Sequence, residues 1–273
     1  MSKIMYGCQT YPWKMNYDRY AGQIPHIAKT AADAGFKGLE AEIGMLGEFF
    51  DKPDLLKEIL NSNGLTLAAI VLHQDWNHKK ETEEERNLTI KTIEFVKNFP
   101  WAKIVVSHHS GAQERKEGLE LKERRENLLS CMNSVAIRAA ENGIVTCYHP
   151  NSAKNSLFRT EEDYKILFDM LSKSNVGYAP DIGHIVNGGM DPIKILEESR
   201  DIIRHVHFKD RSDDGKWAVM GEGSIDYKSI TQFLINKEYE GWIMVEDESP
   251  RAETDSDGVV RDDGVYIKNF MHE

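Results

Sequence analysis

Short apolar segments alternate with longer amphipathic segments along the whole chain. The apolar segments are rich in β-branched residues and predict strands, whereas apolar residues spaced three and four apart predict helices. Gly35, Gly64 and Gly143 follow three of these helices, at the position where a left-handed turn ends a helix. We expect eight strands, at 4–10, 38–43, 66–72, 103–107, 144–148, 176–179, 202–208 and 242–245. We expect helices near 18–34, 53–62, 82–98, 119–141, 161–172, 192–199 and 227–236.

Eight strands that alternate with helices in 273 residues predict a (β/α)8 TIM barrel rather than an open doubly wound sheet. We expect one domain over residues 1–273. Two stretches, 210–226 and 247–264, are rich in Asp and Gly and show no periodicity. They predict long loops over the C-terminal face of the barrel.

The strand predicted at 202–208 carries an unusual row of polar residues. Period-2 alternation places His205, His207 and Lys209 on one face, and Val206 and Phe208 on the other. A strand of a parallel sheet is normally apolar on both faces. Metal coordination would explain the polar row.

Composition excludes several classes of protein. The net charge of −11 and the absence of a Lys/Arg run argue against nucleic-acid binding. No apolar run reaches the ~18 residues of a membrane span, and the N-terminus does not resemble a signal peptide, so we expect a cytoplasmic protein without a membrane partner. Cys8, Cys131 and Cys147 are widely spaced and predict buried, reduced thiols.

Polar residues gather where the predicted strands end. In this fold, catalytic groups lie at the C-terminal ends of several strands. Taken singly, an inward His is more often a hydrogen-bonded structural residue than a ligand, but seven of the ten histidines occupy such ends. The residues are Gln9, Tyr11, Trp13, Glu40, Glu42, His73, Asp75, Trp76, His108, His109, His149, Asn151, Asp181, His184, His205, His207, Lys209, Glu246 and Glu248.

Four of these residues form the predicted metal site: His149, Asp181, His207 and Glu246. They come from strands 5, 6, 7 and 8, which are neighbours around a barrel, so their side chains can converge. Two imidazoles with two carboxylates suit one Mn²⁺, Co²⁺, Zn²⁺ or Fe²⁺ ion better than Mg²⁺, which prefers oxygen ligands and water.

Four segments carry a resemblance to a known family. They are Tyr-His-Pro-Asn at 148–151, Pro-Asp-Ile-Gly-His at 180–184, His-Val-His-Phe-Lys-Asp at 205–210 and Gly-Glu-Gly-Ser-Ile-Asp at 221–226. Nearly the whole chain resembles the xylose isomerase-like TIM barrels, which include sugar epimerases, hydroxypyruvate isomerases, inosose dehydratases and endonuclease IV.

The resemblance implies roles for individual residues. Asp181, His207 and Glu246 match metal ligands of the sugar epimerases, and His184 matches a substrate-binding His. The epimerases have a Glu ligand on strand 5, where this chain has Tyr148-His149, as the inosose dehydratase branch does. Epimerases are thought to use two metal-bound carboxylates on opposite faces of the substrate, and His149 would break that symmetry.

The resemblance therefore implies a metal-dependent lyase that acts on a keto-sugar or keto-polyol by α-proton abstraction and β-elimination. Glu246 or His184 would be the base, and Lys209 or His184 the acid or enolate stabiliser. Trp13 would stack on the sugar, although core packing explains it equally well. Glu40, His73 and His108 would bind hydroxyl groups.

Other functions stay open. A sugar epimerase or aldose–ketose isomerase of the same family is the main alternative, followed by an endonuclease IV-like nuclease and by a non-catalytic barrel. Members of this family are often dimers or tetramers, so a homo-oligomer is compatible with the resemblance.

Overall fold

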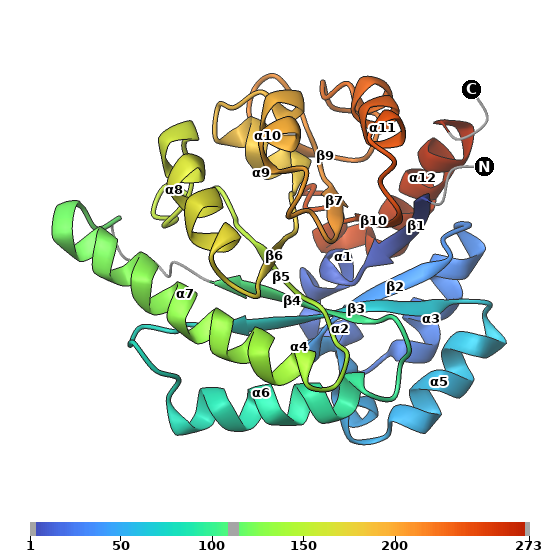
Figure 1. Cartoon of the computed structure of the whole chain (residues 1–273). Helices are drawn as coiled ribbons and strands as arrows, with labels where there is room; N and C mark the ends of the chain where they lie inside the picture. Colours follow the sequence, from blue (N-terminus) through green and yellow to red (C-terminus); the bar gives the residue numbers. More distant parts are fainter. Residues whose placement is uncertain (1–3, 109–114, 271–273) are drawn as a thin grey trace. The chain divides into compact units, whose positions relative to one another are not determined.

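The computed structural model describes residues 4–108 and 115–270. It divides into two compact units, Met1–Ile70 with Val206–Glu273 (unit 1) and Val71–His205 (unit 2). Each strand of the main β-sheet is followed by at least one helix (Figure 1). The prediction of a single domain stays a prediction.

Unit 1 contains four strands joined side by side by parallel pairing. β1 pairs with β2 on one side and with β10 on the other, and β10 pairs with β7. The elements are β1 (Ile4–Gln9), α1 (Tyr11–Lys14), α2 (Tyr17–Tyr20), α3 (Ile24–Asp33), β2 (Gly38–Glu42), α4 (Ile43–Leu46), the 3-10 helix η1 (Gly47–Asp51), α5 (Pro53–Ser62), β7 (Val206–Phe208), β8 (Asp210–Arg211), β9 (Trp217–Ala218), α11 (Tyr227–Asn236), β10 (Gly241–Val245) and α12 (Ala252–Phe270). The strand β3 (Thr66–Gln74) begins in unit 1 and ends in unit 2.

Unit 2 contains the parallel strands β4, β5 and β6, with β5 between the other two. Its long helix α7 packs against α6 and β5 (Figure 1). The elements are α6 (Glu83–Val96), β4 (Lys103–His108), α7 (Gly118–Ala140), β5 (Thr146–His149), α8 (Glu161–Ser172), β6 (Gly177–Tyr178), α9 (Ile182–Asn187) and α10 (Pro192–Ser199).

The helices at 53–62, 161–172, 192–199 and 227–236 are confirmed with the predicted bounds. The helix expected at 18–34 is two helices, α2 and α3. Gly22, with a φ of +73°, separates them, because this left-handed conformation interrupts a helix. The stretch 210–226, predicted as a loop, contains the two-stranded ribbon β8–β9.

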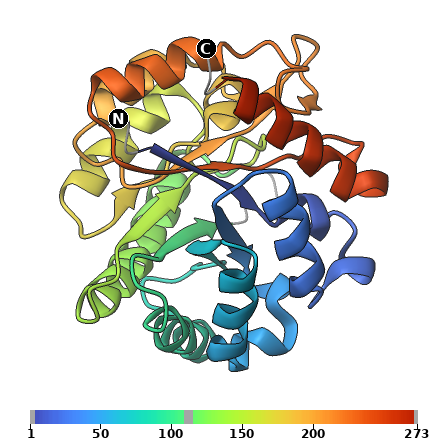
Figure 2. The same cartoon turned by 90° about the vertical axis from the view of Figure 1, so that its right-hand side faces the viewer.

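The loop predicted at 247–264 is wrong from Ala252 onward, where the helix α12 begins, with a kink at Asp255. The glycines and acidic residues of this stretch suggested a loop, but the helix also has an apolar face that includes the fully buried Val259 and Val260. Gly264 faces α3 closely: a Cβ atom there would lie 2.2 Å from the backbone oxygen of Ala34. Figure 2 shows α12 beside the N-terminal helices of unit 1.

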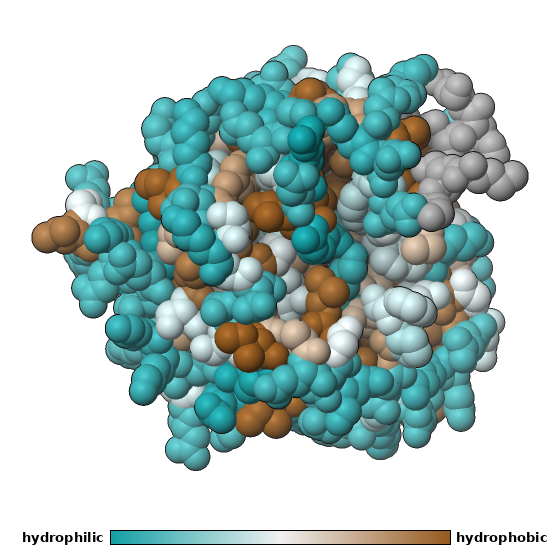
Figure 3. Space-filling model, viewed as in Figure 1, coloured by the Kyte–Doolittle hydropathy of each residue, from teal (hydrophilic) through white to brown (hydrophobic). Residues whose placement is uncertain are grey.

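Hydrophilic residues cover most of the face shown in Figure 3. Within residues 4–108 and 115–270, no helix is long and apolar enough to cross a membrane. The three cysteines are buried and form no disulfide, as predicted.

Candidate active site

Strand register places a row of polar side chains at the C-terminal edge of the unit 1 sheet. Gln9 of β1 is paired with Glu40 of β2, and Val245 of β10 is paired with both Cys8 and Phe208. Because alternate residues share a face, Glu246 and Lys209, which follow these strands, lie on the same face as Gln9 and Glu40. His207 stands one layer deeper, opposite Met244.

His207 lies between two carboxylates and is almost fully buried. Its Nδ1 is 2.7 Å from Oε2 of Glu246, and its Nε2 is 3.1 Å from Oε1 of Glu40. Burial acts to lower the pKa of His207, but the charge of Glu40 and the hydrogen bonds to both carboxylates outweigh it and raise the pKa to about 10. A metal ion at Nδ1 would replace the proton there and leave Nε2–H bonded to Glu40, as metal-bound histidines commonly are.

Lys209 is also buried, with 1% of its side chain exposed. Its ammonium Nζ lies 2.9 Å from Oε1 of Glu246 and 2.7 Å from Oε1 of Glu248. The rings of Tyr11 and Trp217 lie 5.8 and 5.4 Å from the same nitrogen. Both oxygens of Glu246 are therefore held, one by Lys209 and the other by His207.

Unit 2 contributes a second imidazole–carboxylate pair. His149 ends β5, and its Nε2 lies 3.3 Å from Oδ2 of Asp181, which follows β6. The other oxygen of Asp181 accepts the backbone N–H of His184 at 2.8 Å and caps the helix α9. Asp181 is fully buried, and the rings of His149 and His184 meet edge to face at 5.5 Å.

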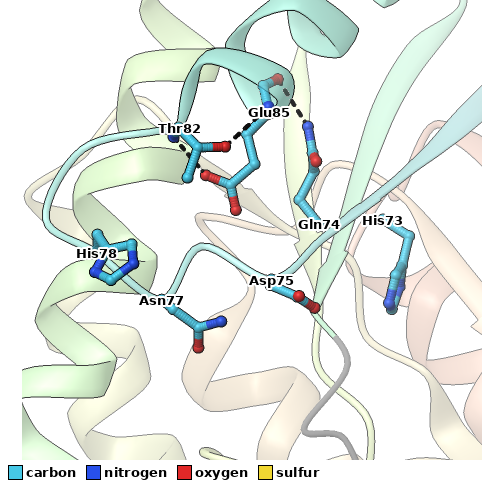
Figure 4. Close-up of a pocket in the computed structure, with 7 residues that line it drawn as sticks. All are labelled: His73, Gln74, Asp75, Asn77, His78, Thr82 and Glu85. Carbon is cyan, nitrogen blue, oxygen red and sulfur yellow. Dashed lines mark hydrogen bonds between the residues drawn. The ribbon is translucent and has the colours of Figure 1, made fainter.

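The remaining predicted substrate residues have diverse partners. His73 lies with its Nδ1 2.9 Å from the Ser107 hydroxyl and lines a pocket of about 350 Å³ at the end of β3 (Figure 4). The Nε2 of His108 lies 3.2 Å from Nη2 of Arg124, on helix α7. His109 lies outside the described residues.

Trp13 is fully buried, and its indole Nε1 donates to Asp257 of α12 at 2.8 Å. This contact ties α1 to α12 and favours core packing over sugar stacking, the two interpretations that the sequence left open.

Sequence reasoning missed three residues that contact the candidate site. Trp217 lies in a ribbon without clear periodicity, and Ser152 and Asn187 are polar residues of common types that carry no motif. Ser152 is identified by its contact with Nδ1 of His184, and Asn187 by the hydrogen bond that it donates to Ser152.

The four predicted metal ligands fit a transition-metal ion by their chemistry. All are buried, with exposed fractions of 8% for His149, 0% for Asp181, 1% for His207 and 4% for Glu246. Each unit supplies one imidazole nitrogen within hydrogen-bond distance of one carboxylate oxygen. Nitrogen and oxygen donors of this kind suit Zn²⁺, Mn²⁺, Co²⁺ or Fe²⁺.

Comparison with known proteins identifies the fold and the family. The sequence is 26% identical to an inosose dehydratase of Geobacillus kaustophilus over 273 aligned positions, which cover 90% of this chain and 87% of the relative. The structure is similar to that of an IolI protein with a bound zinc atom (TM-score 0.77, 15% identity, 97% of each chain). It is also similar to a 3-keto-D-glucoside 4-epimerase of E. coli (TM-score 0.74, 19% identity, 98% of this chain and 100% of that chain).

These likenesses confirm the predicted (β/α)8 barrel. The family model described as xylose isomerase-like TIM barrel matches residues 28–268, most of the chain. The chain therefore belongs to the xylose isomerase-like TIM barrel family.

Proposed function

We propose that this chain is a divalent-metal-dependent lyase that dehydrates a keto-polyol of the inosose type. The enzyme would take a proton from the carbon beside the ketone and release the hydroxyl group of the next carbon as water. Similarity to inosose dehydratases, at 26% and 28% identity for relatives from two genera, supports this reaction class. The observation that carries the proposal is the imidazole of His149, which is bonded to Asp181. An epimerase that removes a proton with one carboxylate and returns it with another would need a carboxylate at this position. The imidazole therefore favours elimination over epimerisation.

The proposed ligands of the ion are His149, Asp181, His207 and Glu246. Consecutive strands of a (β/α)8 barrel end at one face, so residues in or just after the C-terminal ends of β5, β6, β7 and β10 are suited to a common ion. A bound divalent ion would supply Lewis acidity toward the ketone oxygen. Glu40 would orient the ring of His207 by accepting its Nε2–H.

Glu246 is the proposed base. Its Oε1 accepts a hydrogen bond from the Lys209 ammonium, which favours the ionised carboxylate that a base requires. Lys209 thus holds Glu246 in place, while the rings of Tyr11 and Trp217 limit the access of water to the Nζ of Lys209. The proton taken from carbon would reside on a carboxylate oxygen of Glu246 and then pass to the departing hydroxyl group, which leaves as water.

The test is to incubate the purified protein with Mn²⁺ and a keto-inositol. Elimination produces a new enone or diketone absorbance. Exchange of the α-hydrogen for deuterium from solvent, without that absorbance, would instead indicate an epimerase or isomerase and would overturn the lyase proposal.

A matched pair of variants checks the role of the ligands. Asp181→Asn keeps the shape and the helix cap but removes a ligand charge, and we expect a loss of about 100-fold or more in activity. Asp33→Asn makes the same change at an exposed ion pair with Lys29 and should leave activity unchanged.

A further inference from the structure

Three polar residues of unit 2 form a hydrogen-bonded series that ends at His184. The Nδ2 of Asn187 donates to the hydroxyl Oγ of Ser152 at 2.8 Å, and the same oxygen lies 2.8 Å from Nδ1 of His184. Ser152 follows β5, and His184 and Asn187 lie one turn apart on α9. Ser152 and His184 are 3% and 6% exposed, so bulk water competes little for these bonds.

The chemistry of these groups sets the direction of each bond. An amide NH₂ group only donates, so the contact from Asn187 occupies a lone pair of Ser152. With one lone pair of Oγ taken by Asn187, donation of the single hydroxyl hydrogen to Nδ1 of His184 uses the hydrogen-bonding capacity of every group in the series. In that arrangement the lone pair at Nδ1 accepts from Ser152, and the ring hydrogen of the neutral imidazole is on Nε2.

We propose that Ser152 and Asn187 are positioning residues that fix His184 as the Nε2–H tautomer. The inference rests on the proposed function for its consequence: His184 serves as a neutral hydrogen-bond donor to a substrate oxygen and not as the base. A base must direct a lone pair at the substrate, and that of His184 faces Ser152. No proton leaves the ring in this role; the Nε2–H group stabilises negative charge that develops on a ketone or hydroxyl oxygen.

The fold supports this role by fixing the ring beside a proposed metal ligand. The backbone N–H of His184 is bonded to Asp181, and its ring packs edge to face against His149. A donor in that place can contact an oxygen of a substrate held by the same ligands. Of the two candidate bases predicted from the sequence, Glu246 and His184, Glu246 then remains.

The decisive test is 15N NMR of the histidine side chains in the full-length protein, purified with diamagnetic Zn²⁺. The signals of His184 are assigned by their absence in the variant His184→Gln. We expect an Nδ1 shift typical of an unprotonated ring nitrogen and an Nε2 shift typical of a protonated one. The reverse pattern, or a doubly protonated ring, would overturn the proposal without any reference to substrate.

Asn187→Asp provides the matched perturbation. A carboxylate at this position accepts the Ser152 hydroxyl hydrogen, so Oγ would present a lone pair to His184 and the ring hydrogen would move to Nδ1. We expect the two shifts to exchange and kcat/KM for a keto-inositol to fall by about tenfold or more. Asn61→Asp adds the same charge at an exposed helical position and should change neither quantity.

Ser152→Ala gives a second measurement that does not depend on how Asn187→Asp folds. Without the hydroxyl, the preference for Nε2–H should weaken, and the Nδ1 shift should move toward the value of a mixed tautomer. An unchanged spectrum would contradict the positioning role. The 15N shifts of wild-type His184 test this inference alone. If they show the Nε2–H tautomer but the protein does not eliminate water from keto-inositols, the result contradicts only the proposed function.

Discussion

The variant Glu40→Gln distinguishes two roles of Glu40: support of the proposed metal ligand His207, and the substrate binding that the sequence predicted. The change removes a buried negative charge, while the amide oxygen can still accept a hydrogen bond from Nε2 of His207. Glu40 is fully buried, and Oε1 and Oε2 lie 3.1 and 3.3 Å from that nitrogen. This geometry is that of a carboxylate that supports a metal-binding histidine.

Removing such a carboxylate partner typically costs 10–100-fold in metal affinity. Because Gln retains a hydrogen-bond acceptor, we expect the lower end for Glu40→Gln: about a tenfold weaker Kd for Zn²⁺, or about 1.4 kcal/mol. Glu40→Leu, which leaves Nε2–H without this acceptor, should lose about 100-fold. Isothermal titration of metal-free protein with Zn²⁺ gives the values directly.

The control is Glu48→Gln, the same change at an exposed residue of η1 paired with Lys52. It should bind Zn²⁺ as the wild type does. If Glu40→Gln leaves the zinc affinity unchanged but raises KM for a keto-inositol, then Glu40 contacts substrate and the supporting role assigned to it is refuted.

Three further changes test other parts of the structure. Asp163 forms a capping box with Thr160, the N-cap residue of α8, and bonds Arg115 and Arg125. Burial acts to raise the pKa of Asp163, but hydrogen bonds from Arg115 and from the backbone of Thr160 and Arg159 lower it from 3.8 to about 2. A lowered pKa stabilises the folded state above pH ~4 and loses that effect as the pH falls toward 2, so Asp163→Asn should cost about 2 kcal/mol in urea unfolding at pH 7 and progressively less below pH 4. An equal loss at pH 7 and pH 2.5 would contradict the assignment. Trp13→Phe removes the hydrogen bond to Asp257 and should cost about 1 kcal/mol with an unchanged KM, because we assign Trp13 to packing; a raised KM would restore its substrate role. Gly264→Ala places a Cβ against the backbone of Ala34 and should destabilise the protein by about 1–3 kcal/mol in thermal melts; an unchanged Tm would show that α12 does not pack closely there.

The alternation of strands and helices could be predicted from the sequence because helical and strand periodicities differ and several helix ends carry strong local signals. Thr82, for example, forms a capping box with Glu85 at the start of α6. The helix α12 was not predicted because Gly258 and Gly264 are typical of loops. The close approach to the backbone of Ala34 explains why residue 264 is a glycine. Helix packing of this kind is a long-range property that local patterns do not encode.

The site was predicted where residue type and strand position were sufficient. The sequence placed His149, Asp181, His207 and Glu246 at the ends of buried strands and predicted that they meet; the structure shows the contacts His149–Asp181 and His207–Glu246. The orientation of single side chains did not follow, because it depends on register: Ser107, the register partner of His149, contacts His73, while the next residue, His108, contacts helix α7. The roles of Glu40, Ser152 and Asn187 rest on individual hydrogen bonds, which no spacing in the sequence reveals.

We propose that one divalent ion is bound by His149, Asp181, His207 and Glu246. The most direct measurement is anomalous diffraction from crystals grown with Zn²⁺. We predict one strong anomalous peak at about 2.0–2.2 Å from a nitrogen of each histidine and an oxygen of each carboxylate. A crystal that contains zinc elsewhere but shows no peak among these four side chains would contradict the claim.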